Sequence, residues 1–255
     1  MQGIRRKLLS QNFLNNQKLV SRLVASSSIG KKDLVLEIGP GKGIITKELI
    51  SAAGHVIAVE LDNHWYRFLM NTIHDDSLTL YHGDFLSFSL PRLPYKVFAN
   101  VPFAIEGKII RKLIEHENPP DDCYLVVMDS LAERLLASHK ENMFSIMHKP
   151  WFEFSIIHRF KASDFSPVPS VKPVLFRFVK RLNPLLAFND RSEYRKFVQT
   201  AFGNGLAIRK NLRRSFSVTD IDIALHKLSL RKKIKPTELR LEQWVQLFRL
   251  LKKVG

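Results

Sequence analysis

The apolar residues of the first 140 positions follow two alternating periods. Five short runs rich in Val, Ile, Leu and aromatic residues are typical of buried strands. Between them, apolar residues recur with the spacing of a helix that has one buried face. The predicted strands are residues 34–38, 55–60, 78–81, 95–99 and 124–128, and the predicted helices are residues 44–53, 63–73, 105–116 and 131–139. Strands that alternate with helices predict right-handed βαβ units and a parallel sheet.

The pattern changes after residue 150. Residues 152–157 and 174–179 alternate apolar and polar side chains, which predicts a closing pair of more exposed strands. A proline-rich loop, residues 165–173, separates them, and after Pro184 the remaining periodic segments are all helical. We therefore expect an α/β domain over residues 1–182 and a small all-α domain over residues 183–255.

The composition narrows the class of protein. Hydrophobic residues make up 45% of the chain and charged residues 25%, which excludes disorder throughout. The longest apolar runs are too short to span a bilayer, and the basic N-terminus lacks the apolar segment of a secretory signal. The only cysteine, Cys123, excludes an intrachain disulfide and lies in an apolar run, so we interpret it as a core residue. The nine histidines show no metal-ligand spacing. We expect a cytoplasmic protein without a metal.

Positive charge is concentrated at the C-terminal end. The formal net charge is +16, and residues 171–255 carry 20 Lys and Arg against 6 Asp and Glu, while the preceding residues are almost neutral. A strongly basic C-terminal segment that follows an almost neutral one indicates that the basic segment binds nucleic acid. A well-solvated basic face is the alternative interpretation.

A glycine-rich turn follows the first predicted strand. The segment 37–43 has the spacing G-x-G-x-G, with Gly39 and Gly41, and differs from both the dinucleotide fingerprint and the Walker A loop. Glu60 ends the second strand and Asp84 ends the third, where carboxylates can accept hydrogen bonds from a ribose diol and an exocyclic amine. The predicted ligand is an adenosine compound, and S-adenosylmethionine fits better than NAD. Turn glycines and helix-capping acids are the alternative.

The fourth predicted strand ends in Asn100-Val101-Pro102-Phe103. The lone pair of an adenine N6 amine is delocalised into the ring, so the amine is a poor nucleophile. The Asn100 oxygen and a main-chain carbonyl can accept its two hydrogens, and Phe103 can stack on a flipped base. Catalysis would then come from positioning and electrostatics, with Asn100 and Phe103 as the catalytic residues. A loop with a buried aromatic is the alternative.

With these motifs the chain resembles the adenine-N6 ribosomal RNA methyltransferases of the Erm and KsgA type, over about residues 5–255. The matching segments are Ser10-Gln11-Asn12-Phe13-Leu14, residues 37–43, Glu60 with Asp62, Gly83-Asp84, residues 100–103 and residues 165–171. The resemblance is strongest to the Erm branch, also through residues 124–127 and 132–136. It implies a Rossmann-like class I fold with a seven-stranded, mostly parallel sheet.

The resemblance also implies the function and the site. The expected reaction is methyl transfer from S-adenosylmethionine to an adenine N6 of 23S ribosomal RNA, which confers macrolide–lincosamide–streptogramin B resistance. The expected cofactor contacts are Gln11, Asn12, Leu14, Gly39, Gly41, Glu60, Asp84 and Asn100. Two alternatives stay open: a 16S ribosomal RNA dimethyltransferase, and a non-catalytic RNA-binding or assembly factor on the same fold. DNA adenine methylation is disfavoured by the motif.

Some positions depart from the family pattern. Position 103 is Phe where many members have Tyr, residues 104–107 are less polar than the usual continuation, and Val168 and Ser170 replace lysines. These departures affect the fit of the target base and the number of methyl groups added.

The basic end supplies the candidate RNA contacts. They are Arg195, Lys196, Arg209, Lys210, Arg213 and Arg214, the last four forming like-charge pairs on one side of an expected helix. We expect them to contact phosphates of 23S RNA or of a precursor of the large ribosomal subunit. The enzyme is expected to be a monomer that does not bind membranes. The N-terminal Arg5-Arg6-Lys7 segment either contacts RNA or is solvated. Phe197, Phe202, Phe216 and Trp244 are expected to form the core of the helical domain.

Overall fold

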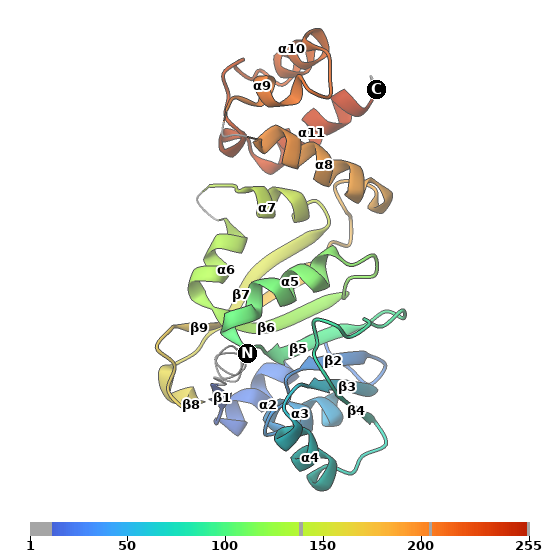
Figure 1. Ribbon diagram of the computed structural model, residues 1–255, viewed down its shortest axis with the longest axis vertical. Coiled ribbons are helices and arrows are strands. Elements are labelled where there is room, and N and C mark those ends of the chain that lie inside the picture. The colour runs from blue at the N-terminus through green and yellow to red at the C-terminus, as the bar shows by residue number, and fades with distance from the viewer. Residues whose placement is uncertain (1–11, 138–139, 204–205, 254–255) are drawn as a thin grey trace. The chain divides into compact units, whose positions relative to one another are not determined.

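The computed structural model describes residues 12–137, 140–203 and 206–253. The chain divides into two compact units (Figure 1). Residues 1–132 and 154–179 form one, which we call the α/β unit, and residues 133–153 and 180–255 form the other, the helical unit. Among the described residues, no helix combines the length and the apolar character that crossing a membrane requires.

A seven-stranded sheet is the centre of the α/β fold. The strand order is β4-β3-β2-β5-β6-β9-β7. The bounds are β2 (Leu34–Ile38), β3 (His55–Glu60), β4 (Leu78–His82), β5 (Lys96–Asn100), β6 (Asp122–Met128), β7 (Phe152–Arg159) and β9 (Pro173–Lys180). The β2 strand is parallel to both β3 and β5, β3 is parallel to β4, β5 is parallel to β6, and β9 is antiparallel to β6. All seven strands coincide with predicted runs to within two residues.

The helices between the strands were also predicted. They are α3 (Ile44–Ala52), α4 (Asn63–Thr72), α5 (Glu106–Glu115) and α6 (Asp129–Leu136). Helices on the sheet leave the central strands buried on both faces, so that Val97, Phe98 and Ala99 of β5 are at most 1% exposed. Cys123 of β6 is fully buried, and its burial raises the pKa of the thiol, which confirms its interpretation as a core residue. The expected last residues of the fourth helix, 138–139, lie outside the described residues.

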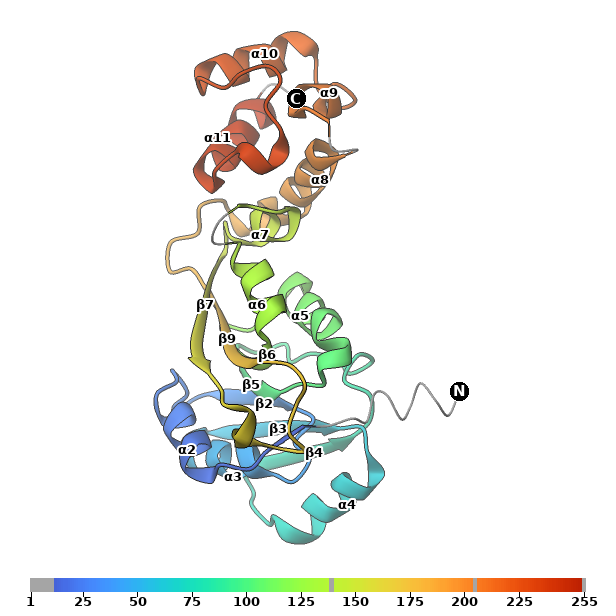
Figure 2. The ribbon, with the colours of Figure 1, turned by 90° about the vertical axis from the view of Figure 1, so that its left-hand side faces the viewer.

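Several elements were not predicted. Helix α2 (Gln17–Ala25) begins after Asn16, whose side chain accepts the Leu19 amide at 3.1 Å. Strand β1 (Phe13–Leu14) pairs antiparallel with β8 (Phe165–Ser166), which joins the start of the described chain to the proline-rich loop. Figure 2 shows α2 and this loop on the same side of the sheet. The pairing is too short for a periodic signal and joins distant segments, so local pattern could not reveal it.

The helical unit has an aromatic core. Its principal helices are α7 (Met143–His148), α8 (Arg191–Phe202), α9 (Ile208–Leu212), α10 (Val218–Lys227) and α11 (Leu241–Lys252). Phe202 stacks on Trp244 with ring centroids 5.4 Å apart, and Phe197 makes edge contacts with Trp244 and Phe216. Phe197 and Trp244 are buried, as expected for the core of this unit, whereas Phe202 and Phe216 are half-buried at its edge.

The division of the chain differs from the expected one in an internal segment and at the boundary, which falls before residue 180 instead of before residue 183. Residues 133–153 belong to the helical unit, although the expected α/β domain included them. The reason is packing: the Trp151 indole donates to the Ala187 carbonyl at 3.2 Å, and its ring meets Tyr194 of α8 edge-on at 5.5 Å. A segment between two strands thus supplies the helical unit with a helix and a buried tryptophan.

Candidate active site

The glycine turn after β2 has a backbone that other residues rarely adopt. Gly39, Gly41 and Gly43 all have positive φ, of 66°, 54° and 77°. At Gly41 a Cβ atom would also lie 2.6 Å from Cε1 of Phe13, so only glycine fits there. Helix α3 starts directly after Gly43. The turn therefore leaves open main chain at the carboxyl edge of the sheet, next to a helix N-terminus.

The aromatic rings of Phe13 and Trp65 pack together beside this turn. The Phe13 ring meets the Trp65 ring edge-on at 5.3 Å, and the Lys42 ammonium lies 5.1 Å from the Phe13 ring centroid. Phe13 was expected only as part of a motif and not as a site residue. Its close approach to Gly41 is a long-range contact, which a linear motif does not display.

Glu60 fixes the turn to the end of the neighbouring strand. Its carboxylate is fully buried and accepts the Gly41 amide at 2.9 Å and the Asp62 amide at 2.8 Å, one on each oxygen. Burial raises the pKa of Glu60, and these amides oppose the shift. Each carboxylate oxygen has a second lone pair, so Glu60 can accept further hydrogen bonds from a diol.

A second buried carboxyl lies behind the turn. Glu37 of β2 is fully buried, and its burial raises the pKa of the carboxyl to about 8. The nearby Thr46 side chain opposes this shift, and the Glu60 charge adds a smaller increase. Within the described part of the chain, neither carboxyl oxygen of Glu37 has a hydrogen-bond partner. The neutral form of Glu37 therefore dominates at neutral pH.

Asp84 follows β4 in a tightly hydrogen-bonded loop. Its Oδ1 accepts the Leu86 amide at 2.8 Å, which leaves Oδ2 for another donor. The Gly83 amide donates to the Glu60 carbonyl at 2.8 Å, which keeps the two acidic residues at adjacent strand ends. A pocket forms between this loop, the glycine turn and α5, and its lining is Ile38, Gly39, Val59, Glu60, Leu61, Gly83, Asp84, Phe85, Pro102, Ile105 and Ile109.

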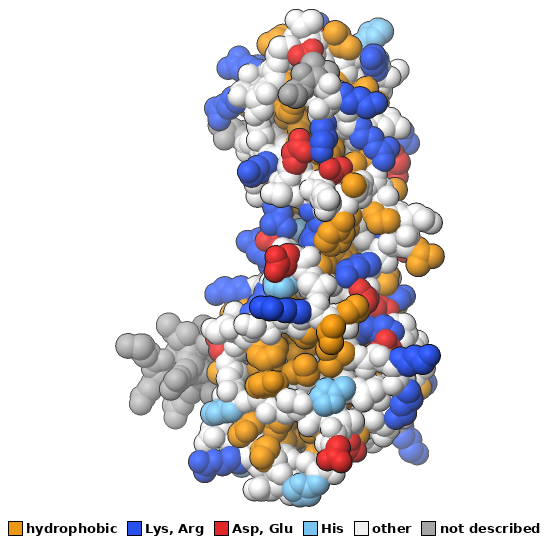
Figure 3. Space-filling view, turned by 90° about the vertical axis from the view of Figure 1, so that its right-hand side faces the viewer, with side chains coloured by type: hydrophobic (Ala, Val, Ile, Leu, Met, Phe, Trp, Pro, Cys, Tyr) orange, Lys and Arg blue, Asp and Glu red, His pale blue; other side chains and the backbone are white. Residues whose placement is uncertain are grey.

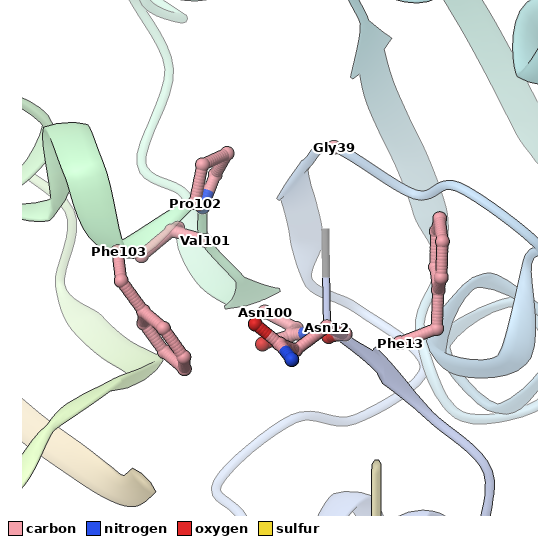
Figure 4. A pocket seen from close by; sticks show the side chains of 7 residues that line it. All are labelled: Asn12, Phe13, Gly39, Asn100, Val101, Pro102 and Phe103. Atoms are coloured by element: carbon pink, nitrogen blue, oxygen red, sulfur yellow. The ribbon is translucent and has the colours of Figure 1, made fainter. Parts of the chain in front are cut away.

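A second pocket adjoins the first and shares Gly39 and Pro102 with it. Its lining is Asn12, Phe13, Gly39, Asn100, Val101, Pro102 and Phe103. Figure 4 shows Asn100 and Asn12 side by side at its centre, with the Phe103 ring on one side and the Phe13 ring on the other. The sequence motifs at the start of the chain and at the end of β5 thus meet in one cavity.

Hydrogen bonds fix the orientation of Asn100. Its Nδ2 donates to the Asn12 main-chain carbonyl at 2.8 Å, and the Asn12 side chain donates to the Pro167 carbonyl at 2.8 Å. Because the amide nitrogen is engaged, the Asn100 Oδ1 is the acceptor left for a ligand. Phe103 begins a short 3-10 helix, η1 (Phe103–Ile105), and its half-buried ring borders the same cavity.

A family comparison agrees with this geometry. The profile of the family described as "Ribosomal RNA adenine dimethylase" matches residues 4–253. The chain belongs to this family. It is therefore an S-adenosylmethionine-dependent ribosomal RNA adenine methyltransferase on a Rossmann-like fold, as the resemblance implied.

Relatives with different targets resemble this family member about equally. The mycinamicin-resistance protein MyrB of Micromonospora griseorubida is 30% identical, over 97% of this chain and 79% of MyrB. Ribosomal RNA small subunit methyltransferase A of a Nostoc species is 32% identical, over 96% of this chain and 97% of that protein. The crystal structure of the 23S rRNA methyltransferase ErmE superimposes with a TM-score of 0.78 at 25% identity, covering 94% of this chain and 100% of ErmE.

The two pockets fit the cofactor of the family. Glu60 and Asp84 offer carboxylate oxygens to one pocket, and Leu61, Ile105 and Ile109 give it apolar walls suited to a flat base. Gly39, Glu60, Asp84, Asn12 and Asn100 therefore lie together as expected, although their contacts with the cofactor stay a prediction.

Two expected cofactor residues have other contacts than expected, and a third cannot be placed. The Leu14 side chain is 4% exposed and belongs to the hydrophobic core, so it lines neither pocket. The Gly41 amide is already bonded to Glu60. Gln11 and the Arg5-Arg6-Lys7 segment lie outside the described residues.

In the described ranges, no three His, Cys, Asp or Glu side chains gather as a metal site.

The expected RNA contacts separate into two kinds. Arg209 forms a two-pronged ion pair with Asp222, which Lys232 also contacts at 3.0 Å, and these cations lower the pKa of Asp222 to about 2. Lys196, Lys210, Arg213 and Arg214 are exposed, and Arg195 is half-buried. Figure 3 shows Lys and Arg side chains spread over the visible face of the helical unit.

One expectation about these residues is wrong. The four basic residues from Arg209 to Arg214 were expected on one side of a helix. Helix α9 ends at Leu212, Arg213 is its C-terminal cap, and Arg214 lies in the following turn. Only Arg209 and Lys210 therefore lie within the helix, and the two like-charge pairs extend beyond its end.

Proposed function

We propose that this methyltransferase transfers a methyl group to N6 of an adenine in 23S ribosomal RNA and thereby confers macrolide–lincosamide–streptogramin B resistance. The observation that carries the reaction is the oriented amide of Asn100 beside Phe103, in a cavity that adjoins the pocket with Glu60 and Asp84. Bound S-adenosylmethionine supplies an electrophilic methyl group on its sulfonium.

The cofactor pocket positions its ligand through the strand ends. Glu60 accepts the two ribose hydroxyls with its remaining lone pairs, and Asp84 Oδ2 accepts the exocyclic amine of the adenine. Leu61 and Ile105 enclose the base between apolar surfaces. Because Glu60 is already held by main-chain amides, little reorganisation is needed on binding.

The adjoining cavity prepares the target base. Asn100 Oδ1 and a main-chain carbonyl of the 101–102 segment accept the two N6 hydrogens, which directs the nitrogen lone pair at the methyl group. Phe103 stacks on the flipped adenine and stabilises positive charge that develops on N6. The new N–C bond forms as the S–C bond breaks, and the surplus N6 proton leaves to water.

The 23S target is supported by relatives of the resistance type. MyrB aligns with almost the whole of this chain, and ErmE shares its fold over the full length of ErmE. A 16S target is the second candidate, because the small subunit methyltransferase of Nostoc is 32% identical. We further propose that the exposed cations of the helical unit contact RNA phosphates.

Methyl transfer to purified RNAs tests the proposal. The protein is incubated with labelled S-adenosylmethionine and with 23S RNA, 16S RNA or the two ribosomal subunits, followed by nucleoside mass spectrometry. We expect N6-methyladenine in 23S RNA only. Label confined to 16S RNA would overturn the 23S target. No label in any RNA, with wild type and an Asn100→Ala variant equally silent, would favour an RNA-binding factor that has lost turnover.

A further inference from the structure

Lys112 of α5 makes unusual contacts for a lysine near a helix end. Its ammonium donates to the Leu86 carbonyl at 2.8 Å and to the Phe88 carbonyl at 2.6 Å. It also lies 5.2 Å from the Phe85 ring centroid. All of these partners belong to the loop after β4. A half-buried lysine therefore joins α5 to a loop that is distant in sequence.

The main-chain amides of this loop already donate hydrogen bonds within the loop, so they are not available to its remaining carbonyls. The Leu86 amide donates to the Asp84 side chain, the Ser87 amide to the Asp84 carbonyl at 3.0 Å, and the Phe88 amide to the Phe85 carbonyl at 3.1 Å. The carbonyls of Leu86 and Phe88 accept instead from the Lys112 ammonium. Lys112 provides charged donors for both, and charged hydrogen bonds are stronger than neutral ones.

The same loop and helix both line the cofactor pocket. The loop contributes Asp84 and Phe85, and the α5 side contributes Ile105 and Ile109. Lys112 lies three positions after Ile109, which places both on one helix face. The Lys112 side chain therefore links the helix that carries Ile109 to the loop that carries Asp84, outside the pocket lining itself.

Electrostatics agree with this placement. Burial lowers the pKa of Lys112, and the Asp84 charge acts in the opposite direction, which shows that the two charges interact. The described residues show no direct ion pair between them within hydrogen-bond distance. The Asp84 Oδ2 therefore stays available for the exocyclic amine.

We propose that Lys112 is a positioning residue for the adenosine half of the cofactor, holding the Asp84 loop at the spacing that one adenine ring fills. This inference rests on the proposed cofactor site. It adds a residue that lines neither pocket and that no sequence motif marks. A purely structural role is the alternative, in which Lys112 stabilises the fold and affects all properties of the protein together.

Ligand binding separates the two roles. S-adenosylhomocysteine and methylthioadenosine, which lacks the amino-acid half, are titrated calorimetrically into wild type, Lys112→Met, Lys112→Arg and Lys108→Met. Lys108 is exposed on the same helix and is the matched control. We expect Lys112→Met to weaken both ligands about tenfold, the scale of one charged hydrogen bond. Lys112→Arg should recover most of the affinity, and Lys108→Met should bind like wild type.

Kinetics give a second readout. Lys112→Met should raise the KM for S-adenosylmethionine by a similar factor and leave kcat at saturating cofactor within about twofold, because the Asn100 site is untouched. A fall in kcat with unchanged KM, or a loss of affinity for S-adenosylhomocysteine but not for methylthioadenosine, would overturn the proposal. If Lys112→Met does not fold, Lys112→Gln, which removes the charge but keeps an amide N–H donor group, carries the same comparison.

An Asp84→Asn variant distinguishes an error in the role of Lys112 from an error in the proposed cofactor site. If Asp84→Asn weakens both ligands and the Lys112 variants bind like wild type, the proposed cofactor site stands and the role of Lys112 is wrong. If Asp84→Asn also binds like wild type, the placement of the adenosine half itself is wrong. If both Asp84→Asn and Lys112→Met weaken binding while their unfolding midpoints stay close to wild type, positioning by Lys112 is supported.

Discussion

The two units of this methyltransferase place their functional side chains in opposite ways. In the α/β unit, Glu60 is buried and Asn100 is half-buried at the end of a strand, and each is held by a hydrogen bond to a main-chain group. In the helical unit, the candidate RNA contacts are mostly exposed cations on short helices and turns. Removing a buried, oriented group should therefore have a large and specific effect, whereas removing an exposed charge should have a small effect that depends on salt.

The largest effect is expected at Asn100. Asn100→Ala removes the Oδ1 acceptor for N6 and should lower kcat by about a thousandfold, the scale of losing one oriented hydrogen-bonding group in an active site. Single-turnover methyl transfer measures this loss, and calorimetry with S-adenosylhomocysteine should show that cofactor binding is only partly weakened. A variant that loses cofactor affinity in proportion to its rate would contradict the assignment of Asn100 to the target base.

A smaller but still specific effect is expected at Phe103. Phe103→Ala removes the stacking surface and should reduce kcat/KM for RNA by about tenfold to a hundredfold, since stacking of one base contributes about 1–3 kcal/mol. Phe103→Tyr keeps the ring and should stay within a few-fold of wild type. Equal activities of the alanine and tyrosine variants would remove the stacking argument.

Glu37 allows the effect of a buried group of the α/β unit to be measured as a change in the free energy of unfolding with pH. Its pKa is raised from 4.5 in the unfolded chain to about 8 in the folded protein. The unfolded state loses this proton first, so folding stability falls as pH rises from about 4.5 to about 8 and then stays constant. Glu37→Gln keeps a neutral side chain of similar shape. It should match wild type near pH 4 and exceed it near pH 9 by at least about 1.4 kcal/mol, one pKa unit.

Denaturant unfolding at a series of pH values measures this difference. Glu117→Gln, which removes an exposed carboxylate just after helix α5, is the control and should not change the slope of stability against pH. A Glu37→Gln variant whose stability follows that of wild type at every pH would mean that Glu37 is ionised without cost in the folded protein.

The smallest effect for each residue is expected in the helical unit. Replacing Lys210, Arg213 and Arg214 by Gln should weaken RNA binding and flatten its salt dependence by about 0.7–0.9 in slope for each phosphate that is no longer neutralised. Arg209→Gln should change the slope less, because Arg209 is paired with Asp222. Filter binding of RNA fragments across a salt series measures both. An unchanged slope in the triple variant would place the RNA footprint elsewhere.

Local pattern predicted the regular elements well for a physical reason. The strands of the α/β unit are buried on both faces and the helices on one, so burial imposes a period on consecutive residues. The same reasoning gave the positions of Gly39, Glu60, Asp84 and Asn100, because parallel strands bring their carboxyl ends to one edge. It failed for the 133–153 segment, whose tryptophan is buried by a residue distant along the chain, Tyr194.

The sequence by itself determined which chemistry is present: a glycine turn, two acids at successive strand ends and an Asn-Val-Pro-Phe motif after a buried strand. Only the tertiary structure decided how these groups are oriented. It placed the Asn12 carbonyl against the Asn100 amide, the Phe13 ring on Gly41, and the Lys112 ammonium on the loop that carries Asp84. Each of these contacts joins residues that are distant along the chain, and a periodic pattern records which face of an element is buried but not which distant group it meets.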